Sequence, residues 1–216
     1  MIMATFEEFE ILATSVSVRC DPDYEYERLV ACYAEPHREY HDLRHIDFCL
    51  KEFFKVRDRR PIVKDYARGE CEHPWLVEAA IWYHDSVYDT HAKDNEERSA
   101  DFAISSLRLR KKDAVIVREL ILDTKHAAMP KTFDGRILAD IDLAGLGKRY
   151  EDFVADGRKI REEYAWVGDE EFMEGRLSFL TGLLRRPTIY WTPMFQKAHE
   201  KRAQMNLRQA VIDLRK

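Results

Sequence analysis

The chain has 216 residues, a net charge of −5, 45% hydrophobic residues and 35% charged residues. Acids and bases are interspersed, which argues against the basic domain typical of proteins that bind nucleic-acid polymers. This charge distribution is still compatible with one cationic pocket for a small anion. At this length we expect one domain over residues 1–216, with a core over about residues 25–185 and terminal helices packed on it.

No targeting or membrane segment is predicted. The first residues, "MIMATFEEFEILATSV", lack the basic start and unbroken apolar core of a signal peptide, and no stretch has 18 uncharged apolar residues. We therefore expect a cytoplasmic protein without membrane contact. The four cysteines contain no Cys-x-x-Cys pair, so we expect reduced, buried thiols and no thiolate metal site.

Hydrophobic residues follow a helical period along almost the whole chain. The clearest segments are residues 6–16, 44–56, 75–83 and 114–122, and strict strand-like alternation is hard to find. Proline-containing pairs mark breaks between helices, as at Asp21-Pro22, His73-Pro74, Met129-Pro130 and Thr192-Pro193. The sequence therefore predicts an all-α fold, a single compact helical bundle.

The tripeptide Tyr-His-Asp occurs twice. In "WYHDSVYD" it follows a strongly apolar helix, so His84 and Asp85 come late in a buried helix. Adjacent side chains on a helix diverge by about 100°, so both reach one metal ion only if it lies over the angle between them. The alternative is a structural histidine beside an aspartate that caps the helix.

The first copy, "EYHDLRHI", places His41 and His45 four residues apart, on one face if the segment is helical. This spacing suits a metal, but Asp42 stands where a zincin requires glutamate. The alternative is one histidine in the core and the other exposed.

Two further segments carry carboxylates. In "ILADIDLAGLG", Asp140 and Asp142 lie in an apolar run, where a buried carboxylate needs a partner such as a metal or the amides of a new helix. Because they are two residues apart, they cannot both face the same way on a helix. In "DNEERSADFA", Asp94 and Glu97 have the spacing of a capping box, which predicts a helix start.

In this order, the motifs "YHDLRHI", "WYHDSVYD", "NEERSA", "DIDLAGLG", "IREEY" and "KRAQMNLR" resemble the HD superfamily of metal-dependent phosphohydrolases, in a bacterial branch. The resemblance runs from about Arg38 to Asn206 and implies an all-α HD domain. It gives the ligand roles to the following residues: His41, His84, Asp85 and either Asp140 or Asp142. His126 is added as a ligand of a second metal or of the substrate phosphate, and His45 is a further candidate near the metal.

The resemblance implies hydrolysis of a phosphomonoester or phosphodiester, with nucleotides among the candidate substrates, by a water on a divalent ion. The ligand types suit Mn, Fe, Co, Ni or Zn, with Mg also a candidate. Asp85 or Glu96 would take the proton from the water, and Lys125 and Arg161 would bind the phosphate unless they are solvated surface charges. The alternative function is a non-catalytic HD module that binds a metal or a nucleotide.

Overall fold

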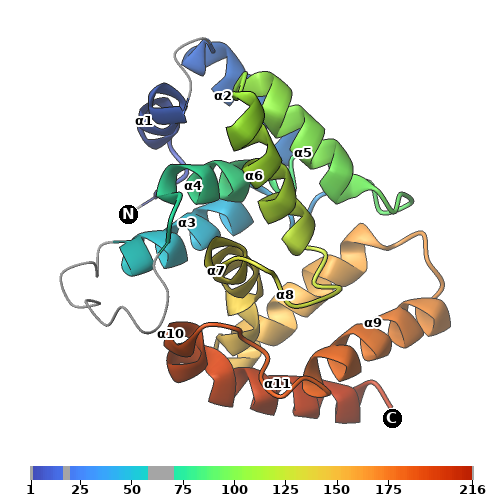
Figure 1. Ribbon diagram of the computed structural model, residues 1–216. Helices are drawn as coiled ribbons and strands as arrows, with labels where there is room; N and C mark the ends of the chain where they lie inside the picture. Colours follow the sequence, from blue (N-terminus) through green and yellow to red (C-terminus); the bar gives the residue numbers. More distant parts are fainter. Residues whose placement is uncertain (1, 17–19, 58–70, 216) are drawn as a thin grey trace.

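The computed structural model describes residues 2–16, 20–57 and 71–215. Every regular element in these ranges is helical, which confirms the predicted all-α class (Figure 1). The elements are α1 (Phe6–Val16), α2 (Pro22–Tyr33), α3 (Leu43–Arg57), α4 (Pro74–Tyr83), α5 (Asn95–Ser106), α6 (Lys111–Asp123), α7 (Phe133–Asp142), the 3-10 turn η2 (Leu143–Gly147), α8 (Tyr150–Glu163), α9 (Asp169–Leu184), α10 (Pro193–Phe195), the π-helical turn η3 (Gln196–Glu200) and α11 (Lys201–Asp213). Helices α2, α4 and α10 begin at prolines that the sequence predicted as breaks.

Helix α4 is the buried centre of the N-terminal part of the fold. All its residues from Leu76 to Tyr83 are buried, because its sequence, apart from Glu78, is apolar around the whole helix and not along one stripe. Helices α1, α3, α5, α6 and α7 pack around it. The prediction of a buried helix before His84 is confirmed. His84 and Asp85 therefore follow directly from a tightly packed helix.

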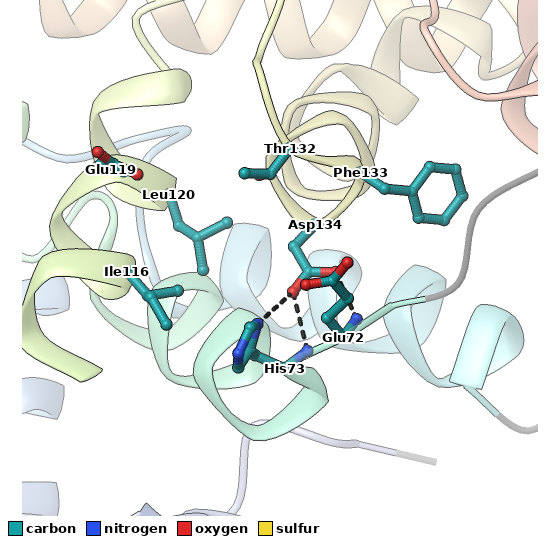
Figure 2. Close-up of a pocket in the computed structure, with 8 residues that line it drawn as sticks. All are labelled: Glu72, His73, Ile116, Glu119, Leu120, Thr132, Phe133 and Asp134. Carbon is teal, nitrogen blue, oxygen red and sulfur yellow. Dashed lines mark hydrogen bonds and ion pairs between the residues drawn. The ribbon is translucent and has the colours of Figure 1, made fainter. Parts of the chain in front are cut away.

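The beginnings of α4 and α7 are tied together by Asp134. Its Oδ1 accepts a hydrogen bond from the backbone N–H of Glu72 at 2.8 Å, and its Oδ2 accepts one from that of His73 at 2.9 Å (Figure 2). These residues lie at a cavity that Ile116 and Leu120 also line. Both helices have ten residues and pack against each other, so their C-terminal ends come to the same level of the fold.

Helix α7 lies between the N-terminal helices and the C-terminal group formed by α9, α10 and α11 (Figure 1). The turn η2 continues directly from α7 and packs on α11. There the Asn206 side chain donates to the backbone carbonyls of Leu146 at 2.8 Å and Lys148 at 2.9 Å. The C-terminal helix therefore braces the end of α7, where Asp142 lies.

Candidate metal centre

Three helices bring histidine and aspartate side chains to one point. His45 lies in the first turn of α3, His84 and Asp85 directly follow α4, and Asp142 is the last residue of α7. The side chains of His45 and His84 are only 2% and 1% exposed, whereas those of Asp85 and Asp142 are 17% and 18% exposed. The imidazoles thus form the floor of the cluster, and solvent reaches it on the carboxylate side.

The facing atoms of the cluster have the separations of ligands that share one ion. The Nε2 atom of His45 lies 3.3 Å from Nε2 of His84, 3.1 Å from Oδ1 of Asp142 and 3.6 Å from Oδ2 of Asp85. Nε2 of His84 is 3.2 Å from Oδ2 of Asp85 and 3.5 Å from Oδ1 of Asp142. Ligands about 2.1 Å from a tetrahedral ion lie about 3.4 Å apart, so this donor set fits a divalent metal.

The orientation of His84 is fixed by its own helix. Its Nδ1 lies 2.9 Å from the carbonyl oxygen of Ile81, an acceptor, so Nδ1 carries the proton. In the neutral imidazole Nε2 then has a free lone pair, and this atom faces the cluster. A backbone carbonyl on the remote nitrogen is the usual partner of a metal-binding histidine.

His126 holds Asp142 from the side away from the other histidines. Its Nε2 donates to Oδ2 of Asp142 at 2.7 Å, which leaves Oδ1 directed at His45 and His84. His126 has a backbone φ of 54°, a left-handed conformation that non-glycine residues rarely adopt outside constrained sites. The structure thus brings His126 to the predicted site, where its Nε2 supports Asp142.

The charges of the cluster favour a cation. Burial alone would raise the pKa of Asp142, but hydrogen bonds from His126, His45 and His84 hold this pKa well below its usual range. Burial likewise opposes ionisation of Asp85, yet the charge and hydrogen bond of His84 lower its pKa. Both carboxylates are therefore ionised at neutral pH, at the open side of the cluster.

Cys49 adds a sulfur atom that the sequence analysis treated as inert. It lies one turn after His45 on α3, with Sγ 3.7 Å from Nε2 of that histidine. One ligand atom from each of His45, Cys49, His84 and Asp142 lies within 4.8 Å of the others. Burial raises the pKa of this thiol well above its ordinary value, so an adjacent metal ion is what would stabilise its thiolate.

The structure places His41 beside the cluster and separates its role from that of His45. His41 precedes α3, and its ring centroid lies 5.8 Å from that of His45. Its Nδ1 donates to Oε2 of Glu163 at 2.7 Å, and its ring stacks on Tyr88 at 4.3 Å. Its side chain is 21% exposed, more than that of either His45 or His84.

Glu163 organises the segment that carries His41. Its Oε1 accepts hydrogen bonds from the backbone N–H groups of Glu39, Tyr40 and His41 at 2.8–2.9 Å. Its Oε2 also accepts from the Tyr88 hydroxyl at 3.0 Å. Burial opposes ionisation of Glu163, but the bonds from His41 lower its pKa to about 2.

Arg38 joins the two Tyr-His-Asp segments. Its side chain is fully buried, and Nη1 donates to the backbone carbonyls of His41 at 3.1 Å and Asp85 at 2.6 Å. Its Nη2 donates to the carbonyl of Ser86 at 3.1 Å. One guanidinium therefore fixes the distance between the segment before α3 and the segment after α4.

Asp140 is turned away from the cluster. Its carboxylate accepts hydrogen bonds from the backbone N–H groups of Trp191 and Thr192, both at 2.7 Å, and from the Thr192 hydroxyl at 2.6 Å. It lies where α10 begins, so it corresponds to the capping alternative. The sequence left either Asp140 or Asp142 as the candidate ligand, and the structure brings only Asp142 to the histidines.

Glu96, Lys125 and Arg161 are engaged with other groups. The Lys125 ammonium lies 2.7 Å from Oε1 of Glu97 and 3.7 Å from Oε2 of Glu96. Arg161 donates to Asp169 at 2.6 Å and to the backbone carbonyl beyond the end of α8. Helix α5 begins where predicted, but the expected capping box is not formed: the Asp94 side chain makes no cap hydrogen bond, and Glu97 is paired with Lys125.

Sequence reasoning missed three residues that shape this centre: Cys49, Arg38 and Glu163. The spacing of Cys49 four residues after His45 was the available signal for the sulfur. Glu163 lies in the quoted motif "IREEY", but nothing local in the sequence shows what Arg38 or Glu163 does, because their partners lie up to 124 residues away.

Comparison with known proteins gives no matching protein family, no matching curated protein and no matching solved structure. In the described ranges, no helix is both long and apolar enough to cross a bilayer. What stands is an all-α protein in which a buried cluster of two histidines, a cysteine and an aspartate could hold a metal ion.

Proposed function

We propose that this protein is a metal-dependent phosphohydrolase that cleaves a phosphomonoester or phosphodiester, as the resemblance to the HD superfamily implies. One observation carries the proposal: side chains from three helices converge so that Oδ2 of Asp85 and Oδ1 of Asp142 each lie 3.1–3.6 Å from the Nε2 atoms of both His45 and His84. Two imidazoles and two carboxylates suit Mn, Fe, Co, Ni or Zn. Small phosphorylated molecules, nucleotides among them, are the proposed substrates.

A divalent metal bound here would supply a water of lowered pKa and would polarise a phosphoryl oxygen. His45 and His84 would hold the metal through Nε2, and Asp142 would hold it through the Oδ1 atom that His126 leaves free. We assign acceptance of the water proton to Asp85, whose carboxylate lies at the solvent side of the cluster.

His41 is the second group suited to move a proton in this proposal. Its Nδ1 is committed to Glu163, so any proton it takes up or gives to substrate moves at Nε2. A carboxylate on the remote nitrogen orients the ring and stabilises the imidazolium, as in known acid–base pairs. The raised pKa of His41 fits this arrangement: burial opposes its charge, but the hydrogen bond that it donates to Glu163 and the negative charges of Asp85, Glu163 and Asp142 together outweigh burial.

The test is an assay of purified protein loaded with each divalent metal against phosphomonoesters, phosphodiesters and nucleotides. We expect His84→Ala and Asp142→Asn to lose stoichiometric metal and activity, and His91→Ala, an exposed histidine outside the cluster, to keep both. Full metal content and activity in His84→Ala would contradict the proposal. Tight metal binding without turnover on the whole panel would favour the non-catalytic module.

A further inference from the structure

An arginine just after α9 contacts the residue that supports the candidate metal ligand Asp142. Nη2 of Arg186 donates a hydrogen bond to the backbone carbonyl of His126. The side chain of the same His126 is 8% exposed, and its Nε2 donates to Oδ2 of Asp142 at 2.7 Å. Arg186 therefore holds the backbone of a residue whose ring holds Asp142.

The backbone of His126 has a conformation that requires support from its surroundings. Its N–H donates to the carbonyl of Asp123, the last residue of α6, at 3.2 Å, and its φ of 54° is left-handed. Many helices end on a left-handed residue, but glycine or asparagine usually fills this position, because other side chains are disfavoured there. A hydrogen bond to the His126 carbonyl stabilises this turn and so fixes the direction of the imidazole.

Arg186 is itself held against the end of α7. Its guanidinium carbon lies 5.1 Å from the centre of the Trp191 ring, and the backbone N–H of Trp191 donates to Oδ1 of Asp140 at 2.7 Å. Asp140 lies two residues before Asp142 on α7. The contacts thus form a closed path from Asp142 through His126, Arg186 and Trp191 back to the same helix.

The placement of the Arg186 guanidinium is costly for the fold. Its Nη1 is buried, and the described part of the chain offers this atom no hydrogen-bond acceptor. Burial also lowers the pKa of the guanidinium, although the negative charge of Asp140 opposes this effect. Buried donors without an acceptor destabilise a protein, and such departures from the rule are expected at functional sites. The contact with the His126 carbonyl is therefore the feature that calls for a functional reason.

We propose that Arg186 is a positioning residue of the metal centre, which acts on Asp142 through His126. With Oδ2 of Asp142 held by His126, the Oδ1 atom lies 3.1 Å from Nε2 of His45 and 3.5 Å from Nε2 of His84. A carboxylate that is ordered before the metal binds loses less conformational freedom on binding, so metal affinity rises. The inference rests on the metal centre of the proposed function and extends it to a residue outside the cluster.

The experiment measures the dissociation constant of Co²⁺ for the full chain, by competition with a chelator of known affinity. We expect Arg186→Ala to weaken cobalt binding by about 10-fold, because changes to residues that hold a metal ligand typically cost about 10- to 100-fold. Arg186→Lys should recover part of the loss, since an ammonium can still donate to the His126 carbonyl but lacks the planar face that lies against Trp191. The matched control is Arg185→Ala, the exposed neighbouring arginine at the C-cap of α9, with cobalt affinity unchanged.

A double-mutant cycle separates positioning from a general loss of stability. His126→Asn supplies a residue that tolerates the left-handed turn but has no atom in the place of Nε2, so Asp142 loses its partner. In this background Arg186→Ala should change cobalt affinity by less than about twofold, because its route to Asp142 is already absent. Urea unfolding of each metal-free variant measures stability separately, and a purely structural Arg186 would lower stability without changing the cobalt affinity of the folded protein.

An unchanged cobalt affinity in folded Arg186→Ala, an equal fold loss in both backgrounds, or the same loss in Arg185→Ala would overturn the inference. If Arg186→Ala does not fold, Arg186→Lys takes its place in the cycle, and an unchanged cobalt affinity there would overturn the inference as well. Turnover of phosphoesters with an unchanged cobalt affinity in Arg186→Ala would overturn the positioning role and leave the hydrolase proposal standing. Cobalt binding that depends on Arg186 through His126, without turnover of any ester, would support the positioning role and contradict hydrolysis.

Discussion

The Nε2 atoms of His45 and His84 lie 3.3 Å apart, although 39 residues separate them in the chain. The Nδ1 proton of His84 is directed at the carbonyl of Ile81, so in the neutral imidazole its Nε2 would present a lone pair to His45. Oδ1 of Asp142 lies 3.1 Å from Nε2 of His45. Electron pairs that converge in a buried site would be stabilised by a cation, so we expect metal binding and folding to be coupled here.

Removal of metal should therefore lower the stability of the protein. At metal concentrations about 100-fold above the dissociation constant, bound metal contributes about 3 kcal/mol, so chelation should lower the melting temperature by about 6–12 °C. Scanning calorimetry with and without a chelator measures this shift. In His84→Ala the chelator should have no effect, and an unchanged melting temperature in the unaltered protein would contradict a bound ion.

Substitutions of Asp140 and Asp142 should have opposite consequences. Asp140→Ala leaves the buried amides of Trp191 and Thr192 without their acceptor, which should cost about 2–4 kcal/mol of unfolding free energy without loss of metal. Asp142→Ala should abolish stoichiometric metal. Urea unfolding together with metal analysis of both variants measures the two effects, and loss of metal in folded Asp140→Ala would refute the assignment.

These two aspartates also show what could and what could not be predicted from the sequence. Helical periodicity and the proline breaks predicted the all-α class and the buried helix before His84, because both depend on local patterns. The choice between Asp140 and Asp142 depends on how α7 is rotated, and this is fixed by Thr192, about 50 residues later. Local spacing carries no information on that contact.

Which of His41 and His45 lies in the metal cluster is likewise decided by contacts between distant parts of the chain. The four-residue spacing suggested one helical face, but α3 begins only at Leu43, so His41 lies in the preceding turn. That turn is held by Arg38 and Glu163 through backbone hydrogen bonds to distant segments. Tertiary contacts of this kind decide which histidine enters the cluster and which stands beside it.

Cys49 should bind the metal through its sulfur. A coordinating thiol loses its proton, and cobalt bound to a thiolate gives a charge-transfer band in the near ultraviolet. We expect cobalt-loaded protein to show this band and Cys49→Ala to lose it while it retains cobalt on the remaining ligands. The matched control is Cys32→Ala, on α2, which should keep the band. A cobalt protein without the band would show that Cys49 only packs against His45.

Arg38→Lys should destabilise the protein although it conserves the charge. An ammonium cannot span the carbonyls of His41, Asp85 and Ser86, so buried acceptors lose their donor at a cost of about 3 kcal/mol. Because the same contacts space the two histidine segments, metal affinity of the folded variant should fall as well. Arg44→Lys, at an exposed arginine paired with Asp42, is the control and should change neither quantity. Equal stability of both variants would show that Arg38 does not hold the two segments together through these hydrogen bonds.

Glu163 should make the stability of the protein depend on acid pH. Its folded-state pKa of about 2 lies below the ordinary 4.5, so its contribution is fully present above pH 4.5 and is lost as pH falls toward 2. The shift corresponds to about 3 kcal/mol, consistent with a buried carboxylate that accepts five hydrogen bonds. Urea unfolding of the unaltered protein and of Glu163→Gln from pH 7 to pH 2 isolates this group from other acids. The free-energy difference between the two proteins should be largest at neutral pH and shrink below pH 4.5; a difference that stays constant over this range would show that Glu163 does not hold the His41 segment through its charge.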